Sequence, residues 1–314
     1  MEKQENEEEF EPQYPAQFYT ARPNPTALLS PLYDSTFKGM FTQETEDSNL
    51  ALQSFVSAVL GRNVTKVLLK PNEPPKDAPS QKGMSYDISI EFDNGEISDI
   101  EMQAFKQDFD YEIRAEIQAA RLLNNNAKKG DDWNSPKVYQ ISILNFHYGK
   151  DDNNELAWYT MKDESGKRLS DRQNIIFIDL KTIRKKLNTP IEELAPVDKW
   201  GLFFSYVDRQ EYADYIGKLV RSEKGIMAAE NTVRYMSEAD ANWFAQNSRF
   251  IAERDKNTQI HNAEKRGREQ GERKKAEETA TNMIKKKYPA SDIAEITGLS
   301  LAEVEALQKK LSTN

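Results

Sequence analysis

The sequence predicts a mixed α/β fold in which helices flank one central sheet. Three observations support this class. Helix-periodic segments alternate with short runs of strand-forming residues up to about residue 190. The turn sequence "DNG" at 93–95 joins two of these runs, and the chain beyond residue 190 has a helical pattern throughout. A chain ordered in this way is typical of one sheet with helices packed on its faces.

The expected elements follow in a clear order. A helix over 48–61 stops at Gly61, a residue that favours helix C-termini, and "VTKVLLK" follows as a short strand. After the paired strands around "DNG", a long helix ends near 125–130. Three more strands are expected, in "KVYQISILNFHY", "NELAWYTMKD" and "NIIFIDLKTI". The first of them is rich in β-formers and is expected near the centre of the sheet.

Shifts in composition divide the chain into four expected parts. Residues 1–25 are acidic and then rich in proline, which predicts a disordered leader. Residues 26–230 form the α/β domain, residues 231–275 a charged helical extension, and residues 276–314 a small helical tail. The tail contains "SDIAEITGLSLAEV", a pattern typical of two helices joined by a glycine turn.

Composition excludes several classes of protein. The chain has 314 residues, enough to bury a sizeable core, and no cysteine, so it has neither disulfides nor a zinc-thiolate site. Its two histidines, His147 and His261, are far apart in sequence, which argues against a multi-histidine metal site. The acidic N-terminus has no apolar signal segment, and no run approaches the length of a membrane span. We therefore expect a cytoplasmic protein that does not enter a membrane.

The formal net charge of −9 argues against a protein that coats nucleic acid by charge alone. It leaves room for an enzyme that meets a phosphodiester locally, through a metal ion and a few cations. The segment 265–275 carries six cations. A solvated helix and a DNA-backbone contact are both compatible with it.

The strand pair 86–104 holds the candidate site. A three-residue type I loop over 93–95, with Gly95 in the left-handed conformation, would place Asp87 opposite Glu101, with Gln103 further along the same face. A two-residue loop, Asn94-Gly95, would shift this pairing by one residue. The prediction of a carboxylate pair therefore depends on the turn type.

Two facing carboxylates repel each other unless a positive charge lies between them. Mg²⁺ prefers oxygen ligands, polarises phosphoryl oxygens and activates a bound water, so it is a natural partner for Asp87 and Glu101. Gln103 cannot take up a proton but can hold a water or a phosphate oxygen. The alternative is an amphipathic hairpin whose polar face is simply solvated.

These residues resemble the PD-(D/E)xK nuclease superfamily, in its branch of recombination-promoting nucleases and transposases. In "YDISIEFDNGEISDIEMQ", Asp87, Glu101 and Gln103 match the branch's aspartate and its "IExQ" strand, where glutamine replaces lysine. "YDSTFKGMF" resembles the opening helix, and "IRAEIQAARLL" the helix after the catalytic strand. Further similar segments are "KVYQISILNF", "IIFIDLKTI", "DKWGLFF" and "IAEITGLSLAEVEAL", so the resemblance covers about residues 28–310.

The resemblance implies a restriction-endonuclease-like mixed sheet flanked by helices, with a helical C-terminal extension. It also implies a Mg²⁺-dependent endonuclease, with Mn²⁺ as a substitute, that cuts double-stranded DNA and is associated with recombination or mobile elements. Asp87 and Glu101 would bind the metal, and Gln103 would position water or phosphate.

Further roles follow from the same resemblance. Asp34 would be an accessory acid, and Arg114 and Lys38 would contact DNA, Arg114 alternatively holding a carboxylate. Local structure allows simpler roles for the same three residues: Asp34 as a helix N-cap, Lys38 as a solvated lysine and Arg114 as an ion-paired arginine. His147 is expected to be a core or rim histidine.

Two other functions remain open. The first is a nuclease fold that binds DNA or a protein partner without cutting, although the intact acidic pair favours catalysis. The second is a transcription regulator that acts through the C-terminal helices. A helix that reads DNA would need cations and amides, but "LAEVEAL" is acidic. We therefore expect these helices to mediate homo-oligomerisation or another protein contact.

Overall fold

The computed structural model describes residues 21–71, 87–106, 110–127, 135–147 and 154–312. Residues 1–20 of the leader expected at 1–25, and most of the proline-rich loop before the hairpin, lie outside these ranges. The chain forms two compact units, residues 1–247 and 248–314, and each is considered by itself.

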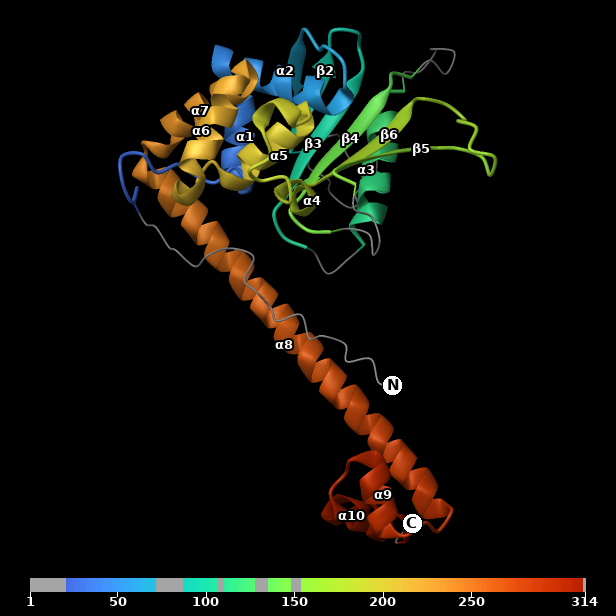
Figure 1. Cartoon of the computed structure of the whole chain (residues 1–314). Helices are drawn as coiled ribbons and strands as arrows, with labels where there is room; N and C mark the ends of the chain where they lie inside the picture. Colours follow the sequence, from blue (N-terminus) through green and yellow to red (C-terminus); the bar gives the residue numbers. More distant parts are fainter. Residues whose placement is uncertain (1–20, 72–86, 107–109, 128–134, 148–153, 313–314) are drawn as a thin grey trace. The chain divides into compact units, whose positions relative to one another are not determined.

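The first unit contains a six-stranded mixed sheet (Figure 1). In spatial order its strands are β1 (Val67–Lys70), β2 (Ile88–Phe92), β3 (Ile97–Gln103), β4 (Val138–Leu144), β6 (Gln173–Asp179) and β5 (Leu156–Thr160). β3, β4 and β6 are parallel, and the other neighbouring strands are antiparallel. The expected sequence of strands is confirmed, and β4 lies in the interior of the sheet as predicted.

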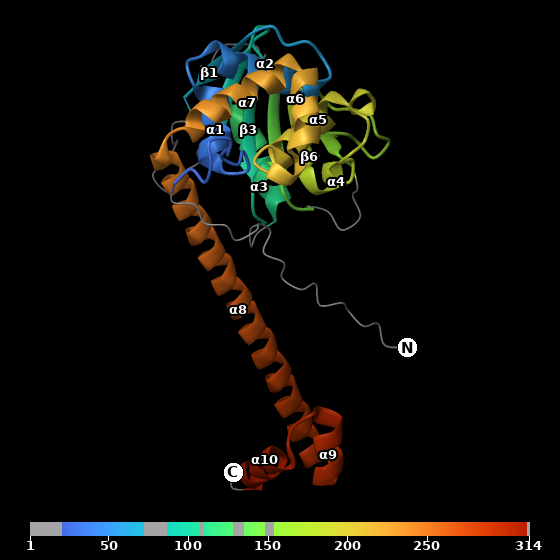
Figure 2. The same cartoon turned by 60° about the vertical axis from the view of Figure 1, so that its left-hand side comes forward.

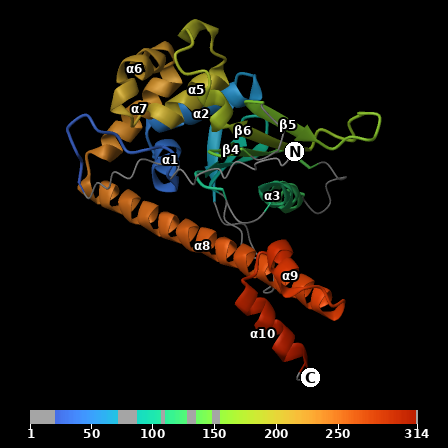
Figure 3. The same ribbon diagram turned by 60° about the horizontal axis from the view of Figure 1, so that its bottom comes forward.

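Helices cover both faces of this sheet. α3 (Tyr111–Asn125) packs on one face, against β4 and β6. The other face carries helices from the two ends of the domain (Figures 2 and 3). They are α1 (Asp34–Thr42), α2 (Glu46–Leu60), α5 (Pro196–Tyr206), α6 (Ala213–Ser222) and α7 (Lys224–Ser237). The short α4 (Leu180–Arg184) follows β6, and 3-10 turns at Ile191–Glu193 and Gln210–Tyr212 flank α5.

Aromatic side chains fill the layer between the sheet and these helices. The Phe41 and Phe55 rings stack at 5.5 Å, and Trp200 lies 5.4 Å from Phe55 and 5.5 Å from Phe204. All of these rings are buried. Each such side chain contributes about 1.5–3 kcal/mol by leaving water, so this cluster anchors α1, α2 and α5 to one another.

The β2–β3 hairpin has the predicted three-residue loop. Phe92 N–H donates to the Glu96 carbonyl at 2.8 Å, and Gly95 has φ +78°, the left-handed conformation that glycine adopts without strain. Ile88 pairs with Ile100, and the next residues along the two strands are Asp87 and Glu101. The predicted opposition of these two carboxylates is therefore confirmed, and the two-residue loop is excluded.

The polar face of the hairpin is not a solvated surface. Every residue of β3 is buried, and Asp99 and Glu101 are both 0 % exposed. α3 lies over this face and removes it from water. The alternative of an amphipathic hairpin with a wet outer face is therefore wrong, and each buried carboxylate requires a compensating partner or a proton.

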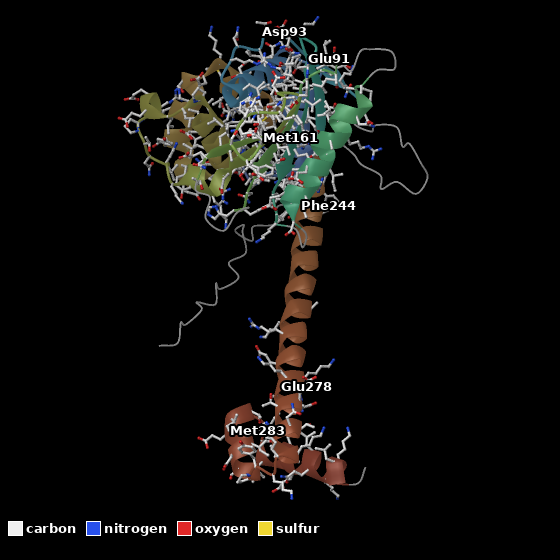
Figure 4. All side chains as sticks on the ribbon, turned by 90° about the vertical axis from the view of Figure 1, so that its right-hand side faces the viewer. Glu91, Asp93, Met161, Phe244, Glu278 and Met283 are labelled. Atoms are coloured by element: carbon white, nitrogen blue, oxygen red, sulfur yellow. The ribbon has the colours of Figure 1, made fainter. Side chains whose placement is uncertain are left out.

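The second unit has a small core of its own. α8 (Asp240–Lys285) runs into it, and α9 (Ala290–Thr297) and α10 (Leu301–Ser312) follow, with Gly298 at φ +71° between them. Ala280, Ile293, Leu299 and Val304 are buried together, and Met283 packs against them (Figure 4). The predicted helix–glycine–helix pattern is confirmed. Among the described helices, none is both long enough and apolar enough to cross a membrane.

Candidate active site

Glu101 is the most firmly held acid of the candidate site. Its Oε2 accepts a hydrogen bond from the Tyr111 hydroxyl at 2.7 Å. Its Oε1 accepts from Arg114 Nη2 at 2.9 Å and from Gln118 Nε2 at 2.6 Å. Charge-assisted hydrogen bonds of this kind offset the cost of burying a carboxylate.

The three donors come from one stripe of α3. Tyr111, Arg114 and Gln118 are three and four residues apart, so they lie on one side of the helix and face β3. Burial, and then the negative charge of Glu101, raise the pKa of Tyr111 well above its usual value, so its hydroxyl keeps its proton and donates. The predicted role of Arg114 as a carboxylate holder agrees with this geometry. Its side chain remains 36 % exposed.

Asp87 lies opposite Glu101 in contact with Lys38. Lys38 Nζ is 3.0 Å from Asp87 Oδ1 and 2.9 Å from Asp34 Oδ1. Burial and the charge of Glu101 raise the pKa of Asp87 to about 6, although Lys38 opposes the shift. Burial lowers the pKa of Lys38, but the hydrogen bonds and charges of Asp34 and Asp87 outweigh it, so this pKa is raised overall. The ammonium therefore remains charged at neutral pH.

This arrangement corrects two of the local alternatives. Asp34 is the first residue of α1, whose N-cap is Tyr33, and the helix has no side-chain cap. The expectation that Asp34 is an N-cap is wrong because its carboxylate turns to Lys38, one turn along the helix. Lys38 is not a solvated lysine, since it is bound between two carboxylates. The opening helix thus brings a cation and a third acid to the hairpin.

Gln103 is the last residue of β3 and is largely buried. Its Nε2 is 3.5 Å from Glu101 Oε2, which is the limit of a hydrogen bond. Its backbone carbonyl accepts from Asn145 N–H at 3.0 Å, which fixes the end of β3 against the segment after β4. The amide therefore lies beside the acidic pair and retains hydrogen-bonding capacity.

Asp99 is a further acid of this face, which the strand pattern did not distinguish as functional. It is fully buried, and within the described residues neither of its carboxyl oxygens has a well-formed hydrogen bond. Burial, followed by the charges of Glu101 and Asp87, raises its pKa well above the usual value, and the neighbouring Gln140 amide opposes the shift only in part. The shift favours the protonated, uncharged form of Asp99.

The strand pattern alone could not find Tyr111 and Gln118. They belong to a different element, and their role depends on α3 lying over the hairpin. The available signal was the spacing of Tyr111, Arg114 and Gln118 along α3, which places three hydrogen-bond donors on one side of the helix. In the described ranges, no group of three or more histidine, aspartate or glutamate side chains is arranged to hold a metal ion. Any metal would therefore depend on the carboxylate pair, with water and substrate as further ligands.

Residues 31–263 match the model of a family described as PD-(D/E)XK nuclease family transposase. The match covers well over half of the 314 residues. The chain belongs to this family. Searches of curated proteins and of solved structures gave no match.

Membership in the PD-(D/E)XK transposase family agrees with the fold. The six-stranded mixed sheet with flanking helices is a PD-(D/E)XK nuclease-like α/β fold with C-terminal helices added. The family relates the chain to nucleases of mobile elements and implies binding to DNA. Such nucleases generally use divalent metal ions. Two facing carboxylates fit that requirement, because a hard cation binds through one or two carboxylates and keeps its remaining positions for water and phosphate.

Proposed function

We propose that this protein is a Mg²⁺-dependent endonuclease that hydrolyses phosphodiester bonds of double-stranded DNA during recombination or the movement of mobile elements. One observation supports the proposal above all. Asp87 and Glu101 face each other across the hairpin, and the repulsion between them raises the pKa of Asp87 beyond the effect of burial. A site under this repulsion favours a bound cation.

Asp87 and Glu101 would hold the metal, with Mn²⁺ as a working substitute. When bound, the metal polarises a phosphoryl oxygen and lowers the pKa of a coordinated water. Tyr111, Arg114 and Gln118 fix the Glu101 carboxylate, so it requires little reorganisation. Gln103 would hydrogen-bond the attacking water or a phosphate oxygen.

The cations of the site would meet the DNA backbone. Arg114 is partly exposed while it holds Glu101, so its guanidinium is accessible to a phosphate. Before the metal binds, Lys38 would neutralise Asp87. Once the metal is bound, Lys38 would contact a phosphate of the DNA. Asp34 would be an accessory acid that holds the Lys38 ammonium near the site. Because the net charge of −9 gives the chain little overall attraction for DNA, backbone contacts would depend on these two cations and on the bound metal.

Two further parts of the proposal concern the protein as a whole. We propose a cytoplasmic protein that assembles with copies of itself through α9 and α10. Exposed Ile296 and Leu301, next to the turn between these helices, support an interface there.

A second candidate function is a DNA-binding module that does not cut. This function is favoured because both acids already have protein partners. Lys38 contacts Asp87, and both oxygens of Glu101 accept hydrogen bonds from α3. In that case the polar cluster would be structural and the metal would have no role.

The two candidates are separated by incubating the protein with supercoiled plasmid in Mg²⁺, Mn²⁺, Ca²⁺ or EDTA. The nuclease proposal expects nicking in Mg²⁺ or Mn²⁺ that disappears in Asp87→Ala and in Glu101→Ala. A folded protein that retards DNA on a gel but leaves it uncut with every metal would favour the binding module.

A further inference from the structure

Hydrolysis of a phosphodiester requires a group that takes a proton from the attacking water. The residues at and next to the Asp87–Glu101 pair are poorly suited to this task. The Gln103 amide cannot accept a proton, and the Lys38 ammonium is engaged in contacts with the Asp34 and Asp87 carboxylates. Glu101 already accepts three short hydrogen bonds, and Asp87 would be a metal ligand. The proton acceptor must therefore be sought elsewhere around the site.

His147 and Asp179 form a pair with the geometry of a general base and the residue that orients it. His147 Nδ1 lies 2.7 Å from Asp179 Oδ2. Asp179 is buried, and its other oxygen accepts a hydrogen bond from Thr182 N–H at 2.9 Å, so the carboxylate is fixed. A proton on Nδ1 that bonds to this carboxylate leaves the lone pair on Nε2. The imidazole is 41 % exposed, so water can reach it.

Strand register relates this pair to the acidic site. Gln103 pairs with Leu144, and Leu144 pairs with Asp179, so the three residues form one row across β3, β4 and β6. Residues in one row point to the same face, and this is the face that α3 covers. Two strand spacings separate the ends of the row, about 10 Å between the backbones of Gln103 and Asp179. The row lies at the carboxyl ends of parallel strands, where α/β proteins bind their ligands.

The segment between the two sites is also fixed. Asn145 donates from its side chain to the Ala104 carbonyl at 3.0 Å, and from its backbone to Gln103. Arg184 donates to the side-chain oxygen of Asn145. The strand end that carries His147 is therefore tied to the residues that follow the acidic pair.

We propose that His147 is the general base of this nuclease and that Asp179 is its positioning residue. This inference rests on the proposed hydrolysis of DNA. The attacking water passes one proton to His147 Nε2 through bridging water, while its oxygen forms a bond to phosphorus. The bond from phosphorus to the leaving sugar oxygen breaks, and that oxygen takes a proton from solvent. Asp179 stabilises the imidazolium until it returns the proton to bulk water.

The charged groups around the imidazole are compatible with this role. Asp179 faces it from β6, and Arg184 of α4 donates a hydrogen bond to the side chain of Asn145, two residues before His147. From α3, Tyr111 packs against the neighbouring Phe146. Among the described contacts of His147, the carboxylate is thus the only direct one with a charged side chain.

The test is single-turnover plasmid cleavage in Mn²⁺ by the full chain and by His147→Ala, His147→Gln and Asp179→Asn. We expect His147→Ala and His147→Gln to cut about a hundredfold more slowly, within the range measured for general bases, with DNA affinity in Ca²⁺ unchanged. Added imidazole should restore the rate of His147→Ala, because a small base can occupy the vacated space, but not that of Asp87→Asn. His261→Gln, which changes the other histidine of the chain, should cut at the wild-type rate.

The variant of the positioning residue gives a second measure, read as the cleavage rate beside the DNA affinity in Ca²⁺. Asp179→Asn keeps an oxygen for Thr182 and should therefore fold, but it should cut more slowly than wild type.

Two results are informative in opposite ways. A His147→Ala variant that cuts at the wild-type rate, or one that is slow but not rescued by imidazole in a folded protein, would overturn the assignment of the base and leave the nuclease proposal intact. A wild-type protein that does not cut with any metal would instead overturn the nuclease proposal itself.

Discussion

Lys38 Nζ lies 3.0 Å from Asp87 Oδ1, so a cation from the opening helix contacts the aspartate that faces Glu101 across the hairpin. The ammonium holds the place next to the carboxylate that a divalent metal would use. Under the proposed function, a divalent metal would compete with Lys38 for Asp87, and the ammonium partly neutralises this carboxylate.

Lys38→Met should strengthen metal binding. Without the ammonium, a divalent ion meets no like charge beside Asp87, so we expect the affinity for Mn²⁺ at pH 8 to rise about fivefold, or about 1 kcal/mol. Calorimetric titration measures this directly. Lys70→Met is the matched control, because Lys70 makes a 2.8 Å contact with Glu91 of β2, and its removal should leave the affinity unchanged. An unchanged affinity in Lys38→Met would contradict the competition.

Asp87→Asn should stabilise the metal-free protein at high pH. The folded protein raises the pKa of Asp87 from 3.8 to about 6, so it binds this proton more tightly than the unfolded chain does. Ionisation therefore costs the folded state up to about 3 kcal/mol, and this cost appears as pH rises from about 4 through about 6. In EDTA, thermal melting should show the variant above wild type at pH 8 and the two converging at pH 4.

The pKa of about 6 already includes the opposing effect of Lys38, so loss of that contact in the variant does not reverse the difference. An Asp87→Asn protein that melts below wild type at pH 8 would mean that the Lys38 ion pair outweighs the burial of the charge. Glu91→Gln serves as the control, because Glu91 is a partly exposed acid near the turn that contacts Lys70, and removing it should not raise the melting temperature at pH 8.

Tyr111→Phe should weaken the position of Glu101 without removing the acid. The variant deletes the 2.7 Å hydrogen bond to Oε2, and hydrogen bonds to charged groups contribute about 1.5–3 kcal/mol. We expect a loss of stability in this range and a reduced rate of DNA cleavage. Tyr139→Phe offers a comparison, since it removes a 3.2 Å hydrogen bond to Glu96 at the other end of the sheet and should affect stability alone. Equal cleavage by both variants would contradict a positioning role for Tyr111.

Gly225→Ala should destabilise the domain. α2 and α7 approach so closely at Gly225 that an added Cβ would lie 2.0 Å from the Ser54 Cβ. Helix backbones must shift to accept it, which costs about 1–3 kcal/mol even after the gain in helix propensity. Chemical denaturation measures the change. Gly217→Ala in α6 would meet only the flexible Arg221 guanidinium at 3.4 Å and should be neutral or stabilising.

The sequence predicts the hairpin well because its register is encoded locally. The loop chemistry of Asp93 to Gly95 decides which residues of β2 and β3 face each other, and a shift of one residue would move every side chain to the other face. The helix ends at Gly61 and Gly298 were also predictable from local sequence, because a glycine in the left-handed backbone conformation ends a helix.

The burial of the polar face was not predictable from the strands. Alternation shows that Asp99 and Glu101 share a face but does not say what covers it. The covering helix α3 follows the strand in the sequence, and Arg114 and Gln118 of this helix contact Glu101 only in the folded chain. The pair of His147 and Asp179 depends in the same way on the parallel register of β4 and β6, which local patterns do not contain.

The most direct test of the central claim is Mn²⁺ binding to the full chain. Glu91 and Asp93 lie at the turn end of the hairpin (Figure 4), so Glu91→Gln and Asp93→Asn are acid-to-amide controls for Glu101→Gln and Asp87→Asn. We predict that wild type and both controls bind Mn²⁺ alike at pH 8, and that Asp87→Asn and Glu101→Gln each lose this binding while remaining folded. Equal Mn²⁺ affinity in all five proteins would contradict the assignment of the Asp87–Glu101 pair as the metal site.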